Sequence, residues 1–308
     1  GLPTTIGPRT MELNEIIDHA WDNHHDAPDD VAKLLAENAA RVGDARTAHQ
    51  YVQVANHVVG DGLGDWPRAK RIADDALAKV SADKALQPAL AEAAAACILA
   101  GDTVAGLVYE GRSVACSPAT AVVAMVYVRA VAAESLARQN RWDEVPGLFD
   151  SAIELAESLE QDEPVARNLA ITSNNVSNCL LAMDPLEPSL APFLEKTAAA
   201  AQRYWTKAGT WQNHARADYM LAVVKNRLGK HDDALKHAEH GVETIRTSGD
   251  SPVDEAFLNL QAASAAKALE DAQGYARYFE RAEGLAASFE KEGLKQWFAT
   301  EADKVKRS

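Results

Sequence analysis

The stretch RADYMLAVVKNRLGKHDDALKHAEHGVETI, residues 216–245, contains two helical patterns separated by a short break. Apolar residues recur three or four positions apart on both sides of Gly229, which is the spacing of one helix face. Small residues, Ala222 before the break and Ala234 and Gly241 after it, occupy positions where two helices would touch. Because small side chains let two helix backbones approach closely, the stretch predicts an antiparallel helix pair. One pair cannot bury both of its apolar faces, so similar pairs are expected beside it.

Breaks of the same kind recur at intervals of about 40 residues, within the range of helical repeats. They fall near Ala27, Gly64, Gly101, Asn140, Asp184, Gly229 and Asp271. No strand-like alternation interrupts the helical patterns. We therefore predict an all-α fold of seven antiparallel helix pairs in one right-handed superhelical solenoid. A last helix through Leu294, Trp297 and Val305 should cap the open end of the stack.

The pattern of residues 216–245 resembles a repeat of the tetratricopeptide (TPR) family. It consists of two helices joined by a glycine-containing turn, with small residues where the helices touch. The resemblance covers most of the chain. It is strongest in residues 216–245 and 133–156, and weakest in the first and third pairs. The breaks are spaced more widely than the family's period of about 34 residues, so longer helices or looser repeats are expected, and HEAT-like packing is the structural alternative. Residues 11–308 are predicted to form a single repeat domain, and residues 1–10 a leader or remnant in front of Met11.

The 308-residue chain is acidic, with 31 basic and 45 acidic residues and a formal net charge of −14. An acidic surface repels the phosphates of nucleic acids and anionic membranes, and no basic cluster reverses this locally. We expect no nucleic-acid partner, no membrane partner and no apolar run of membrane-spanning length. Three cysteines without a CxxC motif fit thiols in a reducing compartment, which predicts a cytoplasmic location.

Three asparagines, Asn174, Asn175 and Asn178, lie in the predicted first helix of the fifth pair. Asparagine is a poor residue for a helix interior, and Asn174 and Asn178, four positions apart, share one face. In the TPR family the first helices line a concave groove, where asparagines bond the backbone of a bound peptide. The resemblance therefore implies a peptide-binding role for both. The alternative is that they bond neighbouring helix ends or face water.

By the same resemblance, Arg216, Tyr219 and Asn226 on the next first helix should point into the groove. Gln50, Gln53 and His57 in the second pair form a similar polar face.

The family's clamp for a C-terminal carboxylate pairs such asparagines with lysine and arginine on adjacent repeats. The matching places in the third and fourth pairs are Ala91, Ala95, Ala130 and Glu134. This departure argues against recognition of a chaperone tail.

Histidines cluster at two predicted helix ends. His24 and His25 stand beside acidic residues at the first turn, and His231, His237 and His240 follow the sixth. Neither cluster shows the four ligands of a structural zinc site, so we expect solvated helix ends and no metal. The chain has no HExxH, GxSxG, GxxxxGK[ST] or GxGxxG motif, so no catalytic residue and no cofactor are predicted.

The resemblance thus implies a non-catalytic scaffold that binds a protein or peptide in its concave groove, with a homo-oligomer as a further possibility. One alternative is the ligand- or peptide-sensing helical-repeat domain of a bacterial-type regulator. Another is an uncommon enzyme or carrier that uses the groove as a pocket.

Overall fold

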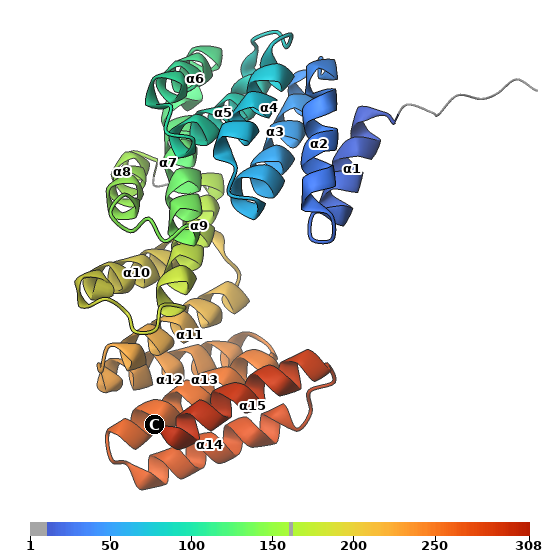
Figure 1. The fold of residues 1–308 in the computed structure, drawn as a ribbon. Coiled ribbons are helices and arrows are strands. Elements are labelled where there is room, and N and C mark those ends of the chain that lie inside the picture. Colours follow the sequence, from blue (N-terminus) through green and yellow to red (C-terminus); the bar gives the residue numbers. More distant parts are fainter. Residues whose placement is uncertain (1–10, 160–162) are drawn as a thin grey trace, which may run out of the picture. The chain divides into compact units, whose positions relative to one another are not determined.

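The computed structural model describes residues 11–159 and 163–308 (Figure 1). This part of the chain is all-helical, contains no strand, and packs its helices against their neighbours in sequence. The α-helices are α1 Leu13–Asn23, α2 Pro28–Asn38, α3 Ala45–Ala55, α4 Trp66–Leu77, α5 Gln87–Leu99, α6 Thr103–Cys116, α7 Ala121–Arg138, α8 Val145–Glu157, α9 Glu163–Leu181, α10 Ala191–Ala208, α11 Trp211–Arg227, α12 His231–Ser248, α13 Pro252–Ala268, α14 Ala272–Ala286 and α15 Glu292–Arg307. The expected leader lies outside the described residues.

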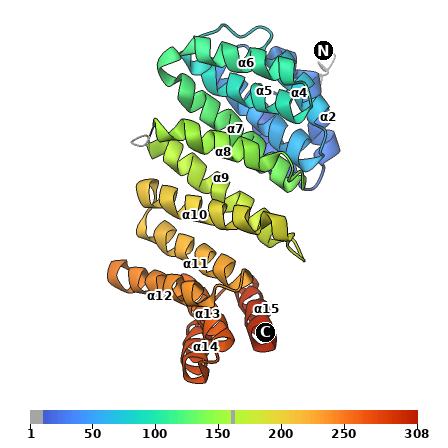
Figure 2. The same ribbon diagram turned by 90° about the vertical axis from the view of Figure 1, so that its left-hand side faces the viewer.

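The chain divides into two compact units, the first with α1–α8 and the second with α9–α15. In the first unit each odd-numbered helix packs against the even-numbered helix after it, and α1, α3, α5 and α7 pack in succession. In the second unit the pairs are α9 with α10, α11 with α12, and α13 with α14, while α15 packs on α13 (Figure 2). The prediction of one domain over residues 11–308 stays a prediction.

The turns form where the sequence predicts them. Gly64, Gly101 and Gly229 adopt positive φ angles of 69°, 81° and 73° at the ends of first helices. Glycine takes this left-handed conformation without steric cost, so it ends a helix readily. Asn140 and Glu270 also adopt positive φ angles, at two other predicted turns.

Aspartates begin several helices. Asp44, Asp65, Asp102 and Asp271 each accept a hydrogen bond from a backbone N–H in the first turn of the helix that follows. Such caps satisfy backbone donors that would otherwise lack a partner.

Small residues mark the closest helix contacts. A Cβ atom on Gly241 of α12 would lie 2.7 Å from a methyl of Leu258 on α13 and 3.2 Å from Cβ of Asp218 on α11. The predicted contact at Gly241 is therefore confirmed. In α5 all the alanines from Ala89 to Ala96 are buried, which lets α3, α4, α6 and α7 pack around this helix.

The last helix covers an apolar cluster of the seventh pair. Phe298, Ala302 and Val305 of α15 pack with Phe257 and Phe289 in one buried cluster. The expected apolar contact is confirmed for Val305 and, in part, for Leu294, whereas Trp297 is 47% exposed.

The first helix of the second pair continues beyond α3 as a π-helix over Asn56–Gly62, a local form that the helical pattern does not predict. Gly60 lies under the indole of Trp66, whose ring atoms would be 2.5 Å from an added Cβ. The lack of a side chain therefore permits this close approach.

The expectation that no apolar run has membrane-spanning length is wrong for Pro118–Arg138. The most apolar 18-residue window of this segment has a mean hydropathy of 1.5, and 44% of that window is buried in the protein. This segment contains α7, which packs against α5, α6 and α8. Core helices of water-soluble proteins have the same composition, so the run by itself is weak evidence for a membrane span.

Candidate functional site on the α3 face

The two predicted asparagines of α9 are available for binding. Asn178 is exposed and Asn174 is half-buried. Neither side-chain amide has a hydrogen-bond partner among the described residues. The alternative that they bond neighbouring helix ends therefore does not describe them.

The three predicted residues of α11 are engaged within the second unit. The guanidinium of Arg216 donates to Asp254 of α13 at 3.1 Å. The Tyr219 ring packs edge-on against Phe257, with 6.2 Å between ring centroids, and burial raises the pKa of its hydroxyl. The Asn226 amide donates to the backbone oxygen of Gln261 at 3.0 Å.

The predicted residues therefore fall into two groups. Both α9 and α11 pack against α10, and direct contact between α9 and α11 is slight at most. The prediction that these five residues line one concave surface stays a prediction.

The first unit presents a more complete polar face. Five side chains of α3 and its π-helical continuation lie three or four positions apart, so they share one side of the helix. These residues, the α3 face, are Arg46, His49, Gln50, Gln53 and His57, all exposed or partly exposed. The opposite side carries Ala48, Tyr51, Val52 and Ala55, all fully buried.

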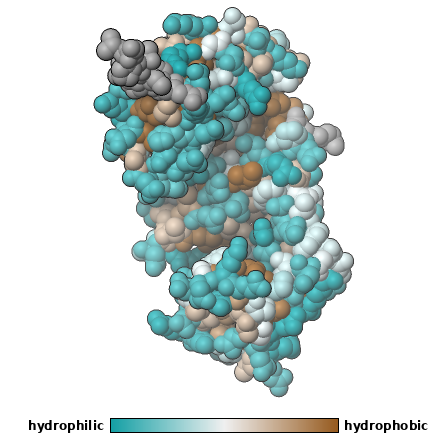
Figure 3. Space-filling model, turned by 90° about the vertical axis from the view of Figure 1, so that its right-hand side faces the viewer, coloured by the Kyte–Doolittle hydropathy of each residue, from teal (hydrophilic) through white to brown (hydrophobic). Residues whose placement is uncertain are grey.

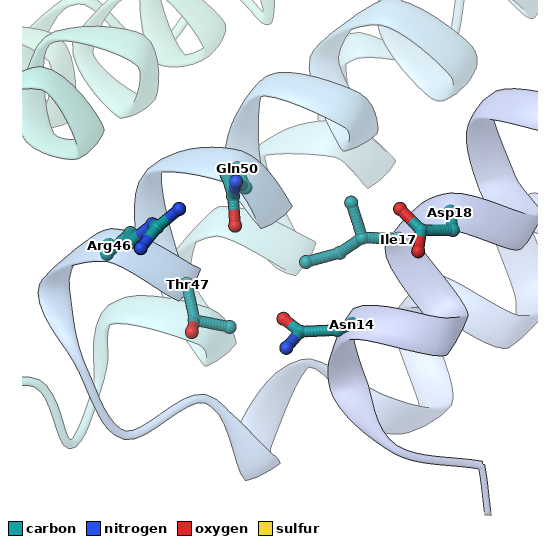
Figure 4. A pocket seen from close by; sticks show the side chains of 6 residues that line it. All are labelled: Asn14, Ile17, Asp18, Arg46, Thr47 and Gln50. Atoms are coloured by element: carbon teal, nitrogen blue, oxygen red, sulfur yellow. The ribbon is translucent and has the colours of Figure 1, made fainter.

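The N-terminal part of the α3 face lines a polar pocket against α1. This α1–α3 pocket has a volume of about 380 Å³ (Figure 4). Its lining residues are Asn14, Ile17, Asp18, Arg46, Thr47 and Gln50. Figure 4 shows Arg46 and Asp18 on opposite walls, with the amides of Asn14 and Gln50 between them.

The polar groups of this pocket have free hydrogen-bonding capacity. The side chains of Asn14, Asp18, Arg46 and Gln50 bond no other described residue. Amides supply donors and acceptors together, while the guanidinium supplies only donors and the carboxylate only acceptors. The pocket can therefore bond a ligand that carries both kinds of group, as a peptide backbone does.

An apolar pocket of about 240 Å³ adjoins the same helix, where His49 of α3 meets α5 and α7. It is lined by His49, Gln87, Pro88, Ala91, Val123, Ala124 and Tyr127. Ala91 belongs to the predicted clamp positions, but Ala95 and Ala130 are fully buried. Ala95 and Ala130 therefore lie in the core between helices, where their side chains are not accessible to a ligand.

A buried hydrogen-bond network fixes the three helices behind these pockets. Glu92 of α5 is 3% exposed and accepts bonds from Asn56 at 2.9 Å and from the Tyr127 hydroxyl at 2.5 Å. Burial and the adjacent Glu92 carboxylate raise the pKa of Tyr127, so its hydroxyl remains a donor. The network connects α3, α5 and α7, and so holds the pocket walls in place.

The C-terminal end of the α3 face lines a third pocket, of about 400 Å³, here called the histidine pocket. Its lining residues are His24, His25, Pro28, His57, Val58, Asp61, Gly62 and Arg138. The His24 ring centroid lies 3.8 Å from that of His25 and 5.0 Å from that of His57. His25 is exposed and His24 is partly exposed, as expected for a solvated helix end, but their rings also contact each other and the ring of His57.

Charges at this pocket are arranged around Arg138. Its guanidinium donates to Asp61 at 3.2 Å and also to Glu134. Burial raises the pKa of Asp61. Burial, followed by repulsion from His24, lowers the pKa of His57, so this imidazole is neutral at pH 7.

The histidines of α12 are also more than a solvated helix end. Asp218 of α11 is 1% exposed, and its carboxylate lies 2.6 Å from Nδ1 of His240 and 3.2 Å from Nδ1 of His237. Gln202 of α10 donates to the same carboxylate at 3.0 Å. Asp218 therefore connects α10, α11 and α12.

Within residues 11–159 and 163–308, no three His, Cys, Asp or Glu side chains are placed to hold a metal ion. Sequence reasoning identified Gln50, Gln53 and His57 as a polar face but missed Asn14, Arg46 and the apolar pocket. The spacing of Arg46, His49 and Gln50, three and four positions apart, could have shown that Arg46 belongs to the same polar helix face. Comparison with known proteins finds no matching family model and no matching curated protein.

Proposed function

We propose that this protein is a non-catalytic helical-repeat scaffold that binds an extended peptide segment of a partner protein along the α3 face. The observation that carries the proposal is the placement of two unlike pockets on one helix face. The α1–α3 pocket offers amides and charged groups without hydrogen-bond partners, and the adjacent pocket is apolar. A peptide has the same alternation, because its backbone is polar and some of its side chains are not.

In this arrangement the amides of Asn14 and Gln50 bond the peptide backbone, since each can donate and accept. Arg46 attracts a carboxylate of the ligand, and the apolar pocket takes an aliphatic or small aromatic side chain. Pockets for separate side chains give specificity, while backbone bonds position the segment.

We further propose that the helix pairs form a right-handed TPR-type superhelix and that the chain acts in the cytoplasm. Seven helix pairs with small residues at their contacts support the superhelix. The thiols of Cys97 and Cys116, which are not in disulfides, support the location. The described surface in Figure 3 is mostly hydrophilic with small apolar patches, as expected for a protein in water.

A regulatory, ligand-sensing domain is the second candidate, and the histidine pocket favours it. Its lining includes His57 and Asp61 of the π-helix, a type of irregularity that is frequent at functional sites.

The test is a selection of displayed random peptides against the wild-type protein, followed by measurement of their binding to wild type and to a Gln50→Ala, Arg46→Ala double variant. Selected peptides are titrated by calorimetry. Gln50→Ala should weaken binding by about 0.5–1.5 kcal/mol, the usual value of one hydrogen bond. Lys33→Ala, an exposed change on α2, is the matched control and should bind like wild type. Peptides that bind the double variant and wild type equally would contradict the proposal.

A further inference from the structure

An apolar stripe is exposed on the outer side of α6. Val104, Leu107 and Val108 are 75%, 64% and 57% exposed. They are three of the seven large hydrophobic side chains exposed in the described part of the chain, and they fall within five consecutive positions. The inner side of the same helix packs normally, as the Tyr109 hydroxyl donates to Asp74 of α4 at 2.6 Å.

The stripe continues into small residues. Gly111 and Ala115 are exposed and follow Val104, Leu107 and Val108 at helical spacing. No residue of this chain packs at the Cβ position of Gly111, because an added Cβ would meet nothing within 4 Å. Gly106 on the inner side differs, since its Cβ would lie 3.0 Å from Ile98 of α5. Gly111 therefore leaves room on the stripe for a close approach by another helix, although a glycine inside a helix weakens it relative to alanine.

We propose that this stripe is a self-association face, on which α6 of a second copy packs antiparallel across α6 of the first. An antiparallel copy can place the large Val104 of one chain over Gly111 of the other, while Leu107 and Val108 of the two copies meet at the centre. With the twofold axis between Leu107 and Val108, Val104 of each copy lies over Gly111 of the other. A twofold interface requires this kind of self-complementarity.

Charge supports the same orientation. The antiparallel arrangement brings the exposed Arg112 of one copy near Asp102, the residue that begins α6 in the other. An antiparallel arrangement also places the positive end of one helix dipole beside the negative end of the other, which is favourable, whereas a parallel arrangement places like ends together. No charged side chain belongs to the stripe itself, although the whole chain carries a net charge of −14.

The size of the face predicts a weak dimer. Three aliphatic side chains expose a few hundred Å² at most, against the roughly 800 Å² that each partner buries in a standard interface. The dissociation constant should therefore be on the order of 10–1000 μM, with association increasing with concentration.

The test is sedimentation equilibrium of the full chain over a concentration range that spans these values. Wild type should approach a dimer at the highest concentrations. Gly111→Leu should remain monomeric, because the new side chain fills the position that receives Val104 of the second copy. It should also fold normally, since the position is open and leucine favours helix. Leu107→Glu should also abolish the dimer.

The matched control is Gly284→Leu in α14, another exposed helical glycine with nothing within 4 Å of its Cβ position. It should dimerise like wild type. Arg112→Glu should weaken the dimer by roughly two- to fivefold at low salt, as exposed ion pairs are weak. A wild-type chain that stays monomeric throughout overturns the proposal. A dimer that survives Gly111→Leu overturns the assignment to α6.

Discussion

Replacing Gly241 by alanine tests whether small residues set the spacing between helix pairs. A new Cβ would lie 2.7 Å and 2.9 Å from the two end methyls of Leu258, and 3.2 Å from Cβ of Asp218. The leucine methyls can rotate away, but the Asp218 Cβ is fixed to the α11 backbone. The added methyl therefore forces either a strained Leu258 rotamer or a wider gap between α11, α12 and α13.

The magnitude follows from two opposing effects. Alanine favours an exposed helix interior over glycine by about 0.5–1 kcal/mol. Overpacking a tight contact costs about 1–3 kcal/mol. Gly241→Ala should therefore lower the free energy of unfolding by about 0–2.5 kcal/mol. Gly284→Ala, at an open helical position, should gain stability from helix propensity alone.

The assay is urea unfolding followed by circular dichroism for both variants and wild type. The difference between Gly241→Ala and Gly284→Ala isolates the packing cost, which should be about 1–3 kcal/mol. If Gly241→Ala stabilises the chain as much as Gly284→Ala, α12 does not approach its neighbours closely at this position, and the reasoning fails.

Three further outcomes are expected. For a peptide that binds the second unit, Asn178→Ala should weaken binding by about 0.5–1.5 kcal/mol without changing the melting temperature; unchanged affinity in a calorimetric titration would show that Asn178 does not bind such a peptide. Burial raises the pKa of the Cys97 thiol to about 12, so a maleimide at pH 8 should label the half-buried Cys116 while Cys97 reacts only after denaturation; equal labelling rates would contradict its burial. Because the pKa of His57 is lowered from 6.5, the unfolded chain takes up this proton first as the pH falls. Stability should therefore decrease below about pH 6.5 until the pH drops below the folded pKa. His57→Gln should reduce this decrease in melting temperature, and an identical pH profile would show that His57 is not responsible.

Local sequence predicts the helices of this chain well, because their ends are set by nearby residues. Glycines such as Gly64, Gly101 and Gly229 can adopt positive φ, and the turns form there. The expected contact at Gly241 is also present. These features depend on backbone geometry and side-chain size, which a sequence shows directly.

The candidate site was less predictable, because it depends on contacts between helices far apart in sequence. Tyr219 matches a groove position by resemblance but packs against Phe257. His57 shares its pocket with Arg138, which lies at the end of α7. Periodicity shows which side chains share one helix face, but not which neighbouring helix covers that face.

The most direct measurement of the peptide-binding account is site-specific photo-crosslinking with a selected peptide. A photoreactive amino acid replaces Gln53, an exposed member of the α3 face, or Lys33 on α2 as the control. We expect a crosslink from position 53 that excess unlabelled peptide abolishes, and none from position 33. A crosslink from position 33 with none from position 53 would contradict binding along the α3 face.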